Sequence, residues 1–230
     1  MASFSAAFGR RRFLQGGAAV GAIVLFGSEW LTSEAFAEEL LRTPPLTEGP
    51  FYPDKLPLDT DNDLIIISDS ITPAVGEITH LSGRVLDAGG SPVKDATVEI
   101  WQCDAKQVYL NSRDSVPKAK QRDTNFQGFG RFTTGSSGEY RFRTIKPVPY
   151  SGRTPHIHFR VNRNGREVLT TQVFINGFQQ NGRDGVFNGI RDPLDRELVL
   201  VDFVPLKDSK INELSAKFDV VIGRTPSDRN

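Results

Sequence analysis

The sequence predicts an all-β chain folded as an antiparallel β-sandwich with long loops. Three observations favour this fold class. The 230 residues contain 21 glycines and 14 prolines, and these residues divide the chain with frequent turns. The runs between the turns are short and alternate in polarity, as half-buried strands do. No segment of useful length with helical periodicity follows the N-terminal apolar run. Short strands joined by turns are typical of a sandwich.

Residues 1–37 are expected to be a targeting segment rather than part of the fold. Three arginines at 10–12 precede a small, apolar run at 16–27, which is shorter than the ~20 residues needed to span a bilayer. Ala-Phe-Ala at 35–37 has small residues at both positions that a cleavage site requires. The Arg-Arg-x-Phe-Leu pattern resembles a twin-arginine signal. An ordinary secretory signal and an uncleaved anchor are the alternatives.

The remaining chain divides into three parts. Residues 38–75 are dense in Pro and Gly, and we expect an irregular segment that forms part of the active-site mouth. Residues 76–224 should form the β-sandwich catalytic domain, and 225–230 a tail. Residues 176–196 are rich in Gly, Asn, Asp and Arg and are expected to form a long surface loop. The expected strands are Thr79–Leu86, Ala96–Trp101, Tyr140–Ile145, His156–Asn162, Val168–Ile175, Glu197–Val204 and Lys217–Ile222.

Charge and cysteine content exclude some classes of protein. The chain has 28 basic and 28 acidic side chains, so the basic excess of a nucleic-acid-binding protein is missing. Cys103 is the single cysteine, which excludes an internal disulfide. We interpret it as a small packing residue, because free cysteine behaves as a hydrophobe when buried.

Two of the three histidines stand at i and i+2, in His156-Ile-His158. In an extended strand alternate side chains point to one face, so both imidazoles should point toward the same place. Tyr150 precedes them across a turn, and Arg153 lies between. This arrangement indicates a metal site with a cationic side chain beside it. A strand with two surface histidines is the alternative that the pair by itself leaves open.

Longer motifs surround these residues. Gly83-Arg-Val-Leu-Asp-x-x-Gly-x-Pro-Val-x-x-Ala-x-Val-Glu-Ile-Trp101-Gln-x-Asp104 is followed by Gly138-x-Tyr140-x-Phe142-Arg-Thr-Ile-Lys-Pro-x-Pro-Tyr150. Arg153-x-Pro-His156-Ile-His158-Phe159 and Thr171-Gln172 complete the set. With these motifs the chain resembles the intradiol ring-cleavage dioxygenases, the family of the protocatechuate and catechol dioxygenases, over about residues 46–205. The resemblance implies that family's β-sandwich.

The resemblance also implies a cofactor. The family holds one mononuclear, non-haem Fe(3+) per chain with two tyrosinates and two histidines. Those positions fall on Tyr109, Tyr150, His156 and His158 of this chain. Phenolate is a hard, anionic oxygen donor that suits ferric iron, and two phenolates with one hydroxide balance its charge.

The family's reaction opens a catechol ring between its two hydroxyl-bearing carbons and gives a muconate-type diacid with both atoms of O2. By resemblance, Tyr150 would serve as ligand and then as base, and Arg153 would stabilise negative charge on the substrate ring. Gln172 would hydrogen-bond near the substrate or hold a histidine in its tautomer. A structural ion pair for Arg153 and a plain strand hydrogen bond for Gln172 are the alternatives.

The sequence therefore predicts an exported catechol dioxygenase, periplasmic or extracellular, with no stable membrane span after signal cleavage. A non-catalytic exported binding module of the same descent is the competing interpretation. Two departures from the family leave the catechol and a homo-oligomeric state open. Only five residues separate Tyr150 from His156, fewer than in bacterial protocatechuate enzymes, and the helical dimerisation segment of catechol dioxygenases is missing.

Overall fold

The computed structural model describes residues 40–67 and 72–223. The expected targeting segment at 1–37 and the expected tail at 225–230 lie outside these residues, so both stay predictions. No helix in the described part is long and apolar enough to cross a membrane.

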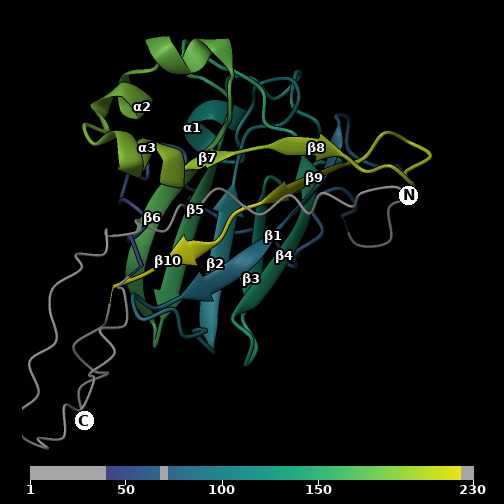
Figure 1. Ribbon diagram of the computed structural model, residues 1–230. Helices are drawn as coiled ribbons and strands as arrows, with labels where there is room; N and C mark the ends of the chain where they lie inside the picture. The colour runs from purple at the N-terminus through teal and green to yellow at the C-terminus, as the bar shows by residue number, and fades with distance from the viewer. Residues whose placement is uncertain (1–39, 68–71, 224–230) are drawn as a thin grey trace, which may run out of the picture. The chain divides into compact units, whose positions relative to one another are not determined.

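The chain forms a β-sandwich of two five-stranded sheets (Figure 1), which confirms the predicted fold class. Strands β4, β1, β9, β10 and β8 form the first sheet, in which β1 pairs with β4 along one edge and with β9 and β10 along the other. The second sheet has the order β3-β2-β5-β6-β7. The first sheet contains β1 (Ile78–Leu86), β4 (Glu139–Ile145), β8 (Phe203–Pro205), β9 (Leu214–Lys217) and β10 (Val220–Val221). The second contains β2 (Ala96–Trp101), β3 (Phe129–Thr133), β5 (His156–Arg163), β6 (Arg166–Ile175) and β7 (Leu200–Val201).

The long pairings β1–β4, β2–β3, β2–β5 and β5–β6 are antiparallel, as predicted, and short parallel pairings make both sheets mixed. Two expected strands differ from the structure. The segment 197–204 begins in helix α3 (Pro193–Leu198), because Asp192 accepts a hydrogen bond from Leu194 N and Pro193 occupies the first turn. The segment 217–222 is divided at Phe218, whose N–H donates to the carbonyl of Ser82.

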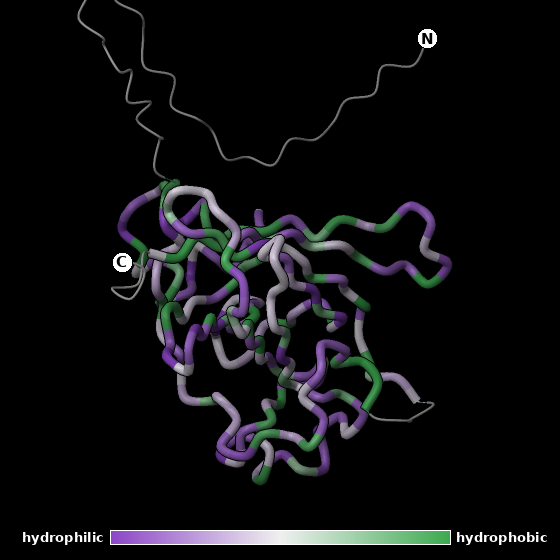
Figure 2. The backbone as a smooth tube through the Cα atoms, turned by 90° about the horizontal axis from the view of Figure 1, so that it is seen from below, coloured by the Kyte–Doolittle hydropathy of each residue, from purple (hydrophilic) through white to green (hydrophobic). Residues whose placement is uncertain are grey.

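The main core lies between the two sheets and is built from alternate residues of each strand. Val98 and Ile100 of β2 and Ile157 and Phe159 of β5 are all fully buried in it. Hydrophobic and hydrophilic residues alternate along much of the chain (Figure 2). Because successive side chains of a strand point to opposite faces, the other residues of β2 and β5 point to the outer face of the second sheet.

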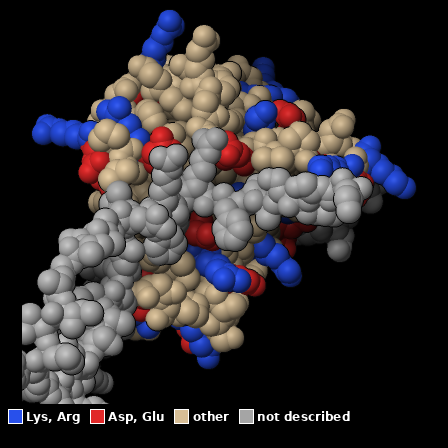
Figure 3. Space-filling view, in the orientation of Figure 1, with Lys and Arg blue, Asp and Glu red and all other residues tan. Residues whose placement is uncertain are grey.

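Loops and short helices cover that outer face and one end of the sandwich: α1 (Ser112–Ser115), the 3₁₀ helix η1 (Gln179–Arg183), α2 (Gly185–Gly189) and α3. The expectation of a surface loop at 176–196 is wrong in part, because Asn181, Asp184, Phe187 and Ile190 are buried there. On the face seen in Figure 3, basic and acidic side chains are interspersed.

Candidate metal centre

The candidate site lies on the outer face of the second sheet. His156 and His158 are 2% and 1% exposed, and they occupy the face of β5 opposite Ile157. β5 begins beside the end of β6, where His156 pairs with Phe174, so the site is next to η1 and α2 (Figure 1). The predicted shared orientation of the two imidazoles is thus present.

The four expected ligands converge. The Nε2 atoms of His156 and His158 are 3.3 Å apart, and Tyr109 Oη is 3.4 Å from His156 Nε2. The Tyr150 ring centroid lies 5.0 Å from that of Tyr109 and 5.5 Å from that of His156. Tyr109 comes from the loop after β2 and Tyr150 from the turn before β5, so the fold brings three separate segments to one point.

All four side chains are neutral in the protein alone. Burial, followed by the nearby charge of Arg153, lowers the pKa of His156 to about 4. Burial, then His156 and Arg153, also holds the pKa of His158 well below its usual value. Burial raises the pKa of both tyrosines, most of all that of Tyr109. The site is therefore rich in lone pairs and carries no charge of its own.

The tautomer of His156 follows from its surroundings. Its Nδ1–H donates to the carbonyl of Thr154 over 2.7 Å, which leaves the Nε2 lone pair directed toward His158 and Tyr109. His158 Nδ1 is buried without a hydrogen-bond partner in the described part of the chain. Two imidazole nitrogens in such close contact favour a cation between them, because a metal accepts both lone pairs.

This donor set fits Fe(3+). Two phenols that ionise on binding supply hard anionic oxygens, and two neutral imidazoles complete the set. Within residues 40–67 and 72–223 no group of three or more His, Cys, Asp or Glu side chains is arranged to hold a metal. The candidate set contains only two residues of those types, so its metal chemistry depends on Tyr109 and Tyr150.

Aromatic side chains and one glycine enclose the histidines. Trp101 stacks on His158, with centroids 4.8 Å apart and planes 6° from parallel. Trp101 is fully buried and packs with Tyr109, Phe129 and Tyr150 in a second hydrophobic cluster on the outer face. Gly49 has φ +71°, and a Cβ there would meet His158 Cε1 at 3.2 Å. Only a glycine lets the covering segment approach His158 this closely.

The short connection between Tyr150 and His156 is a tight reversal. Tyr150 and Arg153 exchange backbone hydrogen bonds of 2.7 and 3.3 Å, and Ser151 and Gly152 between them have φ of 42° and 78°. Positive φ at both central residues is the mark of a type I′ turn. The turn therefore returns Arg153 to the level of Tyr150 and beside the site.

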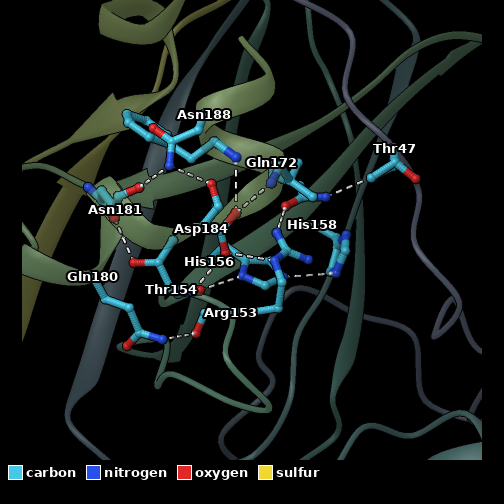
Figure 4. A network of polar contacts seen from close by, with 12 residues as sticks. Thr47, Arg153, Thr154, His156, His158, Gln172, Gln180, Asn181, Asp184 and Asn188 are labelled. Carbon is cyan, nitrogen blue, oxygen red and sulfur yellow. Dashed lines mark hydrogen bonds and ion pairs between the residues drawn. The ribbon is translucent and has the colours of Figure 1, made fainter.

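Arg153 and Gln172 act as a pair (Figure 4). Arg153 Nη2 donates to Gln172 Oε1 over 2.7 Å, and Gln172 Nε2 donates to the carbonyl of Thr47 over 2.8 Å. Gln172 stands opposite His158 in the β5–β6 register. Arg153 also forms an ion pair with Asp184, with 2.7 Å between Nε and Oδ2. Arg153 thus forms the structural ion pair that was the alternative interpretation, and it also lies beside the expected ligands.

Sequence reasoning missed three buried residues around this pair: Thr154, Asn181 and Asp184. Thr154 Oγ1 donates to Asn181 Oδ1 over 2.6 Å, and Asp184 accepts from Thr154 N over 2.8 Å (Figure 4). The one signal in the sequence was an Asp immediately before a short segment that forms a helix, the pattern of an N-cap. The contacts of Asp184 with Thr154 and Arg153 join residues far apart in the sequence, so no local sequence pattern could predict them.

The family model described as Dioxygenase matches residues 47–222, most of the chain. The protocatechuate 3,4-dioxygenase beta chain of Burkholderia cepacia is 34% identical over 74% of this chain and 75% of its own length. The chain belongs to the intradiol dioxygenase family. A chlorocatechol 1,2-dioxygenase of Cupriavidus pinatubonensis is 31% identical over 58% of this chain and 54% of its own length.

Membership of the intradiol dioxygenases agrees with the fold. A dioxygenase domain from a dioxygenase–carbohydrate-binding fusion protein of Streptomyces sp. SirexAA-E superimposes with a TM-score of 0.59 at 28% identity. The match covers 80% of this chain and 99% of that domain. By contrast, the chain spans only about half the length of several curated intradiol relatives.

Proposed function

We propose that the chain is an exported Fe(3+) dioxygenase that opens a catechol-type ring between its two hydroxyl-bearing carbons. The two atoms of O2 enter the product, a muconate-type diacid. The observation that carries this proposal is the convergence of Tyr109, Tyr150, His156 and His158 in a family whose members include catechol, protocatechuate and hydroxyquinol dioxygenases. Export is supported by residues 1–37 of the sequence alone.

When bound, ferric iron supplies an electron-withdrawing centre that makes a chelated catechol reactive toward O2. Tyr109 is suited to remain a ligand, because it is 1% exposed and its N–H donates to Asp114 over 2.8 Å. Tyr150 is the more exposed phenol, at 8%, and lies on a turn. Its Oη can therefore move away and take a proton from a substrate hydroxyl.

Arg153 supplies the positive charge of the site. Its guanidinium lowers the pKa of both histidines, which places its charge near the ligands. Nε and Nη2 are held by Asp184 and Gln172, and no described residue accepts a hydrogen bond from Nη1. That free edge is suited to stabilise negative charge as it develops on the substrate ring.

The first test is optical. Protein loaded with ferric iron should absorb broadly in the visible and look red-brown, because tyrosinate transfers charge to Fe(3+). Tyr109→Phe and His158→Ala should remove iron and colour. Tyr140→Phe is the matched control, because Tyr140 is equally buried but belongs to the main core. A protein that stays colourless with ferric iron would leave the binding module as the better interpretation.

The second test concerns the substrate. Oxygen uptake measured with catechol, hydroxyquinol, protocatechuate and larger catechols would rank them, and a muconate-type product would identify cleavage between the hydroxyl-bearing carbons. A red-brown protein that consumes no oxygen with any member of the panel would contradict the proposed activity while leaving the iron site in place.

A further inference from the structure

We propose that Asp184 is a positioning residue that aims Arg153 at the substrate, so that the segment after β6 sets the direction of the charge. This inference rests on the proposed function, because it assigns Arg153 a substrate to face. Asp184 is fully buried between β6 and helix α2, and it touches neither the histidines nor the tyrosines through a hydrogen bond.

The carboxylate of Asp184 links the segment Arg153–Thr154 to the start of helix α2 (Figure 4). Oδ2 accepts from Arg153 Nε over 2.7 Å and from Thr154 N over 2.8 Å. Oδ1 accepts from Val186 N and Phe187 N, each over 2.9 Å, and so caps helix α2. Burial by itself raises the pKa of Asp184, but the hydrogen bonds from Phe187 N, Arg153 and Thr154 N and the charge of Arg153 hold it below the usual value. The group is therefore an anion with its acceptor capacity filled.

Two anchors determine the orientation of a planar guanidinium. Asp184 fixes Nε, and Gln172 fixes Nη2, so the plane of the Arg153 guanidinium is defined and its Nη1 group points in one direction. The Tyr150–Arg153 turn fixes only the backbone, and the long side chain would otherwise populate several rotamers. Without Asp184 the charge would remain near the site but would spend less time directed at the substrate.

The same carboxylate supports the peptide before β5. Thr154 N donates to Asp184, and the carbonyl of Thr154 accepts from His156 Nδ1. Gln180 Nε2 adds a hydrogen bond of 3.0 Å to the carbonyl of Arg153. The segment at 180–184 thus holds the short connection between Tyr150 and His156.

Asp184→Asn tests the positioning role. Asparagine keeps the shape and an oxygen for Val186 and Phe187, but its NH₂ then faces two donors, Arg153 Nε–H and Thr154 N–H. We expect kcat to fall about tenfold or more, with iron content and the visible band retained. Asp192→Asn is the matched control: Asp192 caps α3 through Leu194 N and has no bond to Arg153. It should leave kcat unchanged. An equal loss in both variants would show that Asp184 only stabilises a helix.

A double-mutant cycle separates action through Arg153 from any other route. Arg153→Ala and Arg153→Ala/Asp184→Asn should have the same kcat if Asp184 acts on the reaction through Arg153, although Asp184 still accepts from Thr154 N and caps α2. Multiplication of the two losses would overturn the inference.

One measurement is independent of iron and activity. In the metal-free wild type, the Nε–H of Arg153 should give a slowly exchanging NMR signal that disappears in Arg153→Ala and in Asp184→Asn. Absence of that signal from the wild type would contradict the contact, whatever the enzyme does. An NMR signal as expected, in a protein without dioxygenase activity, would instead overturn the proposed function.

Discussion

Gly49→Ala should disturb the histidines from outside the ligand set. Two effects add at this position. The backbone has φ +71°, a conformation that costs a residue with a Cβ roughly 1–2 kcal/mol. The new methyl group would also lie 3.2 Å from His158 Cε1 and 3.9 Å from Nε2. Since Trp101 stacks on the same ring, the imidazole has little room to move aside without shifting Nε2.

Gly165→Ala separates the two effects, because Gly165 also has φ +71° but a Cβ there meets no atom within 4 Å. Gly165→Ala should lose about 1–2 kcal/mol of unfolding free energy from the backbone alone, which corresponds to a fall in Tm of roughly 2–8 °C, and Gly49→Ala should lose more, because its methyl group also meets His158. Only Gly49→Ala should also lose affinity for iron and visible absorbance, with activity down about tenfold, given how steeply rates depend on placement at the ångström scale.

The measurements are urea unfolding, iron content after dialysis, and the visible spectrum of each variant. If Gly49→Ala and Gly165→Ala lose equal stability and bind iron equally well, the contact with His158 does not matter and the reasoning is refuted.

Three further predictions follow from burial. In the metal-free protein the depressed pKa of His156, about 4 against 6.5, means that the unfolded chain binds the proton first, so stability is full above pH 6.5 and falls by roughly 3 kcal/mol as pH drops to 4. Urea unfolding across that range should show this slope, and His156→Gln should reduce it; an unchanged slope in that variant would contradict the prediction. Burial raises the pKa of Cys103 to about 12, so the native thiol should not react with a disulfide reagent at pH 8 but should react fully in denaturant; fast native labelling would contradict this. Tyr52→Phe removes the 3.1 Å hydrogen bond to buried Glu99 and should cost about 1–3 kcal/mol in a denaturation curve, whereas no change would mean that water replaces the phenol.

The strands with clean alternation were predictable from sequence. β2 matches the expected Ala96–Trp101 at both ends, and β5 was expected within one residue of its observed end. β3 was missed because Gly130 interrupts its pattern. A Cβ at Gly130 would lie 2.5 Å from Leu64 Cδ1 and 2.9 Å from the carbonyl of Asp61. The glycine is thus required by a segment nearly seventy residues earlier in the chain.

The candidate site was predictable in its expected ligands and in the choice of Arg153 and Gln172 beside them. The spacing of His156 and His158 on a strand predicts that both imidazoles point the same way, and the family resemblance implies Tyr109 and Tyr150. The supports were not predictable, because each is a contact across the fold. Arg153 meets Asp184 thirty-one positions later, and Gln172 donates to Thr47, 125 positions earlier. The stacking of Trp101 on His158 is likewise a contact across the fold.

The alternation along β5 also limits how this site can change during evolution. His156, His158 and Ile157 belong to opposite faces of one strand, so replacing a ligand leaves the packing between the sheets largely intact. Inserting or deleting a single residue within β5 would instead exchange the two faces, turning imidazoles into the core and Ile157 toward the candidate metal centre. Changes of length are therefore better tolerated in the connections on either side of β5, such as the five-residue link after Tyr150, than within the strand itself.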